Sequence, residues 1–106
     1  MTPAEAWLRE HLAESPPRLL AAMVDALPAG ASTPVADALA EAALALYARV
    51  VQGTGGREDA LPLLTADALM THALHAQAEA DPDGIPAFSE RWGAAGKLGE
   101  LAISAA

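Results

Sequence analysis

Two histidines and a glutamate recur at the spacing of one helical face, the arrangement in this chain most suggestive of a metal site. His72, His75 and Glu79 are three and four residues apart, so an α-helix would align their side chains in one narrow stripe. Imidazole and carboxylate groups at this spacing can ligate zinc, although a complete site also needs a ligand from another element. Apolar residues such as Leu69 and Leu74 lie on the other side of the same helix. We therefore expect the stripe to be a solvated face, with no metal bound.

The third histidine, His11, lies among apolar neighbours. Trp7, Leu8 and Leu12 share its helical face, which favours a partly buried, hydrogen-bonded histidine over a catalytic one. No serine stands in a G-x-S-x-G motif, and the glycine-rich segment 53–57 lacks the Lys-Ser/Thr pair of a P-loop. Cysteine is absent, which excludes thiolate catalysis. We expect neither catalytic residues nor a cofactor.

Small residues line one face of segment 86–103, which the sequence pattern predicts to be helical. Trp92, Ala95, Gly99 and Ala102 fall on this face. A glycine inside a helix costs about 1 kcal/mol relative to alanine, and close packing against another helix would offset that cost. We predict that these four residues form an interface with a helical partner protein, most simply a second copy of the chain.

Four larger side chains suggest an alternative function. Tyr47, Met70, Phe88 and Trp92 lie on three predicted helices, where they would line a cavity for a small apolar, isoprenoid-like ligand. Segment 65–74, TADALMTHAL, resembles the "GDALL…A" helix of polyprenyl diphosphate synthases. Those enzymes bind magnesium diphosphate through D-D-x-x-D motifs. No Asp-Asp pair occurs in this chain, so the resemblance transfers no catalytic residue.

Helix start and stop signals divide the chain into five predicted helices. A hydroxyl residue followed by proline, which suits a helix start, recurs at 2–3, 15–16 and 33–34. Gly53 and the Asp-Pro-Asp-Gly turn at 81–84 supply stops. Pro62 predicts either a kink or a start delayed to Leu61. With the apolar periodicity, these signals give helices over about 3–14, 16–27, 34–52, 57–80 and 86–103.

The predicted fold is all-α, because no segment alternates as a strand does. We expect one domain over 1–106, a compact bundle or orthogonal array of about five helices. The segment 34–52, which has few charges, is predicted to be the central helix. The 28 alanines leave the core short of bulk, which is a reason to expect a homo-oligomer.

Charge and composition exclude several partners. The net charge of -8 has the wrong sign for nucleic acid, and no apolar run is long enough to insert into a membrane. The lack of cysteine and of a secretory leader pattern favours a cytoplasmic protein. The sequence thus predicts a small, soluble, non-enzymatic protein-protein interaction module that self-associates.

Overall fold

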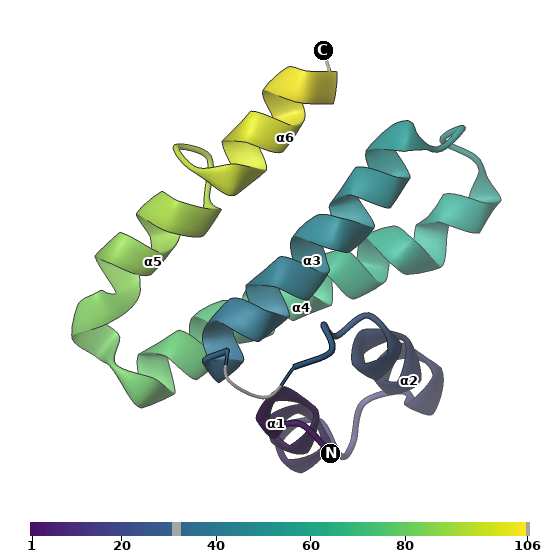
Figure 1. Ribbon diagram of the computed structural model, residues 1–106. Helices are drawn as coiled ribbons and strands as arrows, with labels where there is room; N and C mark the ends of the chain where they lie inside the picture. Colours follow the sequence, from purple (N-terminus) through teal and green to yellow (C-terminus); the bar gives the residue numbers. More distant parts are fainter. Residues whose placement is uncertain (31–32, 106) are drawn as a thin grey trace.

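The computed structural model describes residues 1–30 and 33–105, and all of its regular structure is helical (Figure 1). The prediction of an all-α fold is therefore confirmed. The α-helices in chain order are α1 (Pro3–His11), α2 (Pro17–Asp25), α3 (Val35–Gln52), α4 (Ala60–Ala80), α5 (Ile85–Trp92) and α6 (Lys97–Ala105). Two single 3₁₀ turns, η1 (Arg57–Asp59) and η2 (Pro82–Gly84), precede α4 and α5.

The centre of the fold is an antiparallel hairpin of the two longest helices, α3 and α4 (Figure 1). Small side chains such as Ala40, Ala43 and Ala73 are fully buried, which lets the two backbones approach closely. Leu39 and Leu69 add bulk between them and are also fully buried. Helix α3 is the central helix that the sequence predicts, with buried residues from Ala36 to Leu46.

The shorter helices attach to this hairpin. Leu8 of α1 and Met23 of α2 are fully buried in the core. Helix α5 is held to α3 by Asp37, whose Oδ1 accepts hydrogen bonds from Arg91 Nη1 at 2.7 Å and from Trp92 Nε1 at 2.8 Å. The radius of gyration, 13.5 Å, is that expected for one folded domain of this length.

The ends of α1 and α2 differ from the predicted bounds. Helix α1 ends at His11 instead of residue 14. Helix α2 begins at Pro17 with Pro16 as its cap, because a residue that precedes proline avoids the α conformation. Helix α2 also ends two residues early, at Asp25.

The start of α4 resolves the two alternatives for Pro62. The segment 57–59 forms the 3₁₀ turn η1, and α4 begins at Ala60. Pro62 is the third residue of α4, where the backbone N–H has no intrahelical partner to lose. The predicted alternative in which the helix starts at Leu61 is thus within one residue of the observed start, and Pro62 lies in the first turn of α4.

The single helix predicted over 86–103 is wrong, because the chain turns at 93–96 and forms α5 and α6. Gly93 ends α5 in an extended conformation, and the N–H groups of Gly96 and Gly99 donate to its carbonyl. A Cβ at Gly99 would lie 1.8 Å from the carbonyl oxygen of Ala94, and one at Gly96 would lie 2.2 Å from that of Arg91. These glycines therefore allow the chain to fold back closely on itself.

Within residues 1–30 and 33–105, no helix is both long and apolar enough to cross a membrane.

Candidate functional site

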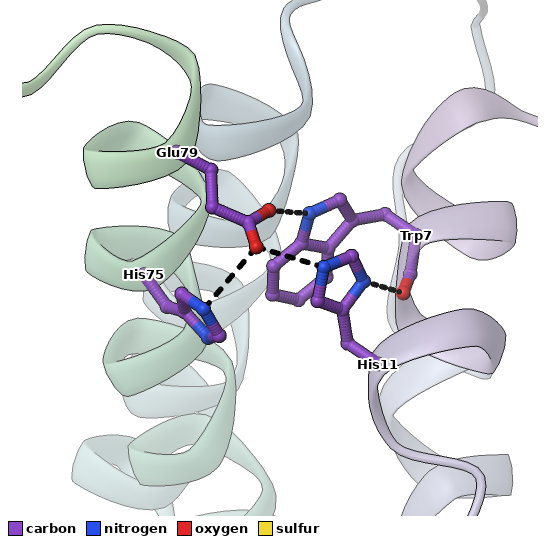
Figure 2. A network of polar contacts seen from close by, with 4 residues as sticks. All are labelled: Trp7, His11, His75 and Glu79. Carbon is purple, nitrogen blue, oxygen red and sulfur yellow. Dashed lines mark hydrogen bonds and ion pairs between the residues drawn. The ribbon is translucent and has the colours of Figure 1, made fainter.

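All three histidines of the chain lie together between α1 and α4, with one tryptophan and one glutamate; four of these five residues are drawn in Figure 2. We call this group the histidine cluster: Trp7 and His11 from α1, and His72, His75 and Glu79 from α4. The expectation of a solvated face holds only in part, because side chains of α1 lie against the α4 stripe and His72 is half-buried. Two of its members remain partly open to water, with His75 49% and Glu79 44% exposed.

Glu79 is the common acceptor of the histidine cluster. Its Oε1 accepts a hydrogen bond from Trp7 Nε1 at 3.0 Å. Its Oε2 lies 3.0 Å from His11 Nε2 and 3.4 Å from His75 Nε2. The hydrogen bond from Trp7, together with the contact to His11, lowers the pKa of Glu79 below its ordinary value. Glu79 is therefore an ionised carboxylate shared by two helices.

His11 has an acceptor at each ring nitrogen. Its Nδ1 lies 2.9 Å from the carbonyl oxygen of Trp7, and its Nε2 lies 3.0 Å from Glu79 Oε2. Both partners can only accept, so both ring nitrogens must donate, and only the imidazolium form has two N–H groups. The bond to the Trp7 carbonyl and the Glu79 carboxylate raise the pKa of His11. The ring also stacks on Trp7 at a centroid distance of 3.9 Å, where the indole face favours a cation.

His72 has the opposite environment. Its Nδ1 is buried and has no hydrogen-bond partner in the described part of the chain. Burial lowers the pKa of His72, and the charges of His75 and His11 lower it further. The histidine cluster therefore favours one charged histidine, His11, beside one neutral histidine, His72.

The contacts of the histidine cluster connect two helices. Across residues 1–30 and 33–105, no group of three His, Cys, Asp or Glu side chains is placed so that it could hold a metal ion. His11 and Glu79 instead use their polar atoms to join α1 to α4. His11 is the hydrogen-bonded, partly buried histidine that the sequence predicts.

The four residues predicted to bind a ligand are placed in different surroundings. Phe88 and Trp92 are buried, with ring centroids 6.4 Å apart. Tyr47 and Met70 are half-buried, and the Tyr47 hydroxyl donates a short hydrogen bond to Asp67 Oδ1. Burial and this carboxylate raise the pKa of Tyr47 to about 12.

None of these four residues lines either of two surface pockets found among the described residues. A pocket of about 270 Å³ lies between α2, α3 and α4, with Asp25 and Arg49 among its lining residues. A pocket of about 300 Å³ adjoins the histidine cluster, where Trp7 and Glu79 form part of its wall beside Val35 at the start of α3.

The four predicted interface residues do not share one helical face, because the helix break separates them. Trp92 is buried in α5, and Ala95 is exposed in the turn. Gly99 is half-buried and Ala102 is exposed, both on α6. The close approach at Gly99 is made by the protein's own backbone at Ala94.

Sequence reasoning missed a second surface of α4, which we call the α4 flank: Leu63, Asp67, Met70 and Leu74. These residues are spaced i, i+4, i+7 and i+11, which places them within about 60° of one another around the helix. Leu63 and Leu74 are 42% and 40% exposed, although their apolar character predicts burial. The sequence signal that could have identified the α4 flank is the same helical periodicity that located the histidine stripe. The stripe lies about 140° away around the helix.

No protein-family model, curated protein or solved structure matches this chain.

Proposed function

We propose that this protein is a non-enzymatic, helical protein-protein interaction module that self-associates through the α4 flank. The observation that supports this proposal is the exposure of Leu63 and Leu74 on one face of the longest helix. Leucines at this spacing are typical of the side of a helix that packs against another helix. In the described structure they face outward, beside the buried stripe that packs on α3.

The order of residues in the α4 flank favours a second copy of the chain as the partner. Leu63 and Leu74 share one midpoint in the sequence with Asp67 and Met70, between residues 68 and 69. Two antiparallel copies of α4 related by a two-fold axis would therefore pair Leu63 with Leu74, and Asp67 with Met70, of the opposite copy. The surface is thus self-complementary, and the two Asp67 carboxylates do not oppose one another.

The hydrogen bond from the Tyr47 hydroxyl makes Asp67 easier to accommodate in the dimer contact. Its hydrogen bond to Asp67 Oδ1 satisfies one carboxylate oxygen from within the same subunit. A charge at the edge of an apolar contact costs less when its oxygens are already hydrogen-bonded. The pair would form the polar side of an interface in which leucine and methionine make the apolar contacts.

Two finer expectations belong to this proposal. A cytoplasmic location suits a chain without cysteine, which has no disulfide to form or lose. The alternative of a bound isoprenoid-like ligand stays a prediction, and native mass spectrometry of the purified protein would report subunit number and bound ligand together.

Sedimentation velocity over a hundredfold range of protein concentration tests the proposal. We expect the wild-type protein to shift from monomer to dimer as its concentration rises. Leu74→Glu should weaken the dimer about tenfold or more, because it places a charge in the apolar contact. Ile103→Glu is the matched control, since Ile103 is 78% exposed on α6 and lies outside the α4 flank. A wild-type protein that stays monomeric throughout this range would refute self-association.

A further inference from the structure

Two histidines where α1 meets α4 have opposite hydrogen-bond environments. We propose that α1 docks most stably on α4 when His11 has a proton on both ring nitrogens and His72 is neutral, and that α1 opens more often on either side of this state. The histidine cluster would thereby make the attachment of α1 sensitive to pH near neutrality. This surface and the α4 flank lie on different sides of α4, so neither proposal rests on the other.

Loss of a proton from His11 weakens its contact with Glu79, which joins the two helices. A neutral His11 that still donates from Nδ1 to the Trp7 carbonyl has only a lone pair at Nε2. That lone pair would face Glu79 Oε2 at 3.0 Å, where a donated hydrogen bond becomes a repulsion. The bond from Nδ1 lies within α1, whereas the bond from Nε2 joins α1 to α4. In the other neutral tautomer Nε2 keeps its hydrogen, but the positive charge that attracts Glu79 is gone. Deprotonation therefore weakens the contact between α1 and α4 in either tautomer.

Gain of a proton by His72 also disfavours the docked state. The added N–H at the buried Nδ1 would have no acceptor in the described part of the chain. The new charge would lie beside His75, whose ring centroid is 6.2 Å away, and near the charged His11. Movement of α1 away from α4 would reduce both costs, because it separates His72 from the charged His11 and admits water to His72.

The direction of each pH effect follows from the folded-state pKa values. The pKa of His11 is raised, so its stabilisation is complete below about pH 6.5, the unfolded value, and is lost as pH rises through the folded value. The pKa of His72 is lowered, so its penalty grows as pH falls below about 6.5 and is complete below the folded value. Docking is therefore strongest between the two folded pKa values, in a window that includes pH 6.5.

Other charged groups around the histidine cluster leave this window in place. Glu10 on α1 supports the charged form of His11. The pKa of Glu79 is lowered, so Glu79 stays ionised through neutral pH and loses its contribution only in acid. Helices α2 and α3 also pack against α1, but none of their charged side chains forms a hydrogen bond or ion pair with the cluster in the described structure; these side chains are Arg18, Asp25, Asp37, Glu41 and Arg49.

Hydrogen exchange followed by NMR tests the proposal on the whole chain. The measured quantity is the protection factor of the amides near the end of α1, from Leu8 to Leu12, divided by that of buried α3 amides in the same sample. We expect this ratio to pass through a maximum between pH 5 and pH 8. Below and above the pH of this maximum, the ratio should fall by about two- to fivefold, the size expected for partly exposed charged contacts.

Two conservative variants distinguish the fall of the ratio in alkali from its fall in acid. His11→Gln keeps a neutral donor and should remove the fall on the alkaline side, whereas His72→Gln should remove the fall on the acidic side. Glu79→Gln, which keeps the shape of the acceptor without its charge, should lower the maximum itself. A wild-type ratio that does not vary with pH would overturn the proposal. So would a profile that both histidine variants leave unchanged.

Discussion

At the scale of single residues, hydrogen-bond partners distinguish the three histidines from one another. His11 has two acceptors, His72 has a buried nitrogen without a partner, and His75 lies 3.4 Å from a carboxylate at the surface. The raised pKa of His11 and the lowered pKa of His72 follow from this difference in partners and burial. The same accounting applies to Tyr47, whose hydroxyl donates to Asp67 beside the α4 flank.

Tyr47 offers a direct test of local electrostatics, because it is the only tyrosine in the chain. Burial and the Asp67 carboxylate both disfavour the phenolate, so absorbance titration near 295 nm should give a pKa of about 12. Asp67→Asn should bring the pKa part of the way toward 10, since burial is the larger cause and remains. Thr71→Ala, one turn further along the exposed side of α4, should leave the titration unchanged. A wild-type pKa near 10 would contradict the described pair.

At the scale of elements, the turn between α5 and α6 shows why three glycines recur in the last part of the chain. The carbonyl of Gly93 accepts from two backbone N–H groups, those of Gly96 and Gly99. A side chain at Gly99 would collide with the backbone oxygen of Ala94, which has no freedom to rotate aside. These contacts lie within one subunit, so they stabilise the monomer.

Gly99→Ala should therefore destabilise the protein. The Cβ would lie 1.8 Å from Ala94 O, and relieving this overlap should cost about 1–3 kcal/mol in the free energy of unfolding. Urea unfolding should show the same loss at low and high protein concentration. Ala102→Leu, at an exposed position of the same helix, serves as the control and should change stability by less than about 0.5 kcal/mol. A loss seen only at high concentration would instead return Gly99 to an interface between subunits.

The sequence predicts elements well where the signal is local. Thr2 caps α1 by accepting from the Glu5 N–H at 3.2 Å, and α3 ends at Gln52, directly before the predicted stop at Gly53. The break at 93–96 was not predicted, because Ala95, Gly99 and Ala102 also fit one small-residue face of a continuous helix. Only the approach of the backbone at Ala94 to Gly99 distinguishes the two, and that approach belongs to the folded chain.

Prediction of the histidine cluster was limited in a different way. The periodicity placed His72, His75 and Glu79 on one face of α4, as observed. It did not show that Trp7 and His11 of α1 would meet them, because periodicity identifies a helical face without naming its neighbour. The exposure of Leu74 was missed for the same reason, since periodicity placed it on the apolar side of the helix without showing which part of that side α3 would cover.

At the scale of the whole molecule, net charge and the α4 flank act against each other. A charge of -8 on each copy opposes association, whereas exposed leucines favour it. Added salt screens the repulsion between copies but has little effect on the apolar contact. The dimer should therefore become stronger as the salt concentration rises.

Sedimentation equilibrium from about 0.05 M to 0.5 M NaCl tests this balance. We expect the dimer dissociation constant to fall by a few fold across the range, as screening of surface charge predicts. An association that weakens with salt would point instead to attraction between opposite charges, as with a basic partner, and would contradict contact between copies of this acidic chain.

Disulfide trapping in mixed samples tests the central claim most directly, because the natural chain has no cysteine. A ¹⁵N-labelled Leu63→Cys variant is mixed with an unlabelled Leu74→Cys variant and oxidised, so that the mixed dimer has its own mass. Antiparallel contact through the α4 flank predicts that the mixed dimer dominates. In the control experiment, a mixture of Ile103→Cys with Leu74→Cys should give only a background level of mixed dimer. Equal trapping in both mixtures, or none in either, would contradict self-association through the α4 flank.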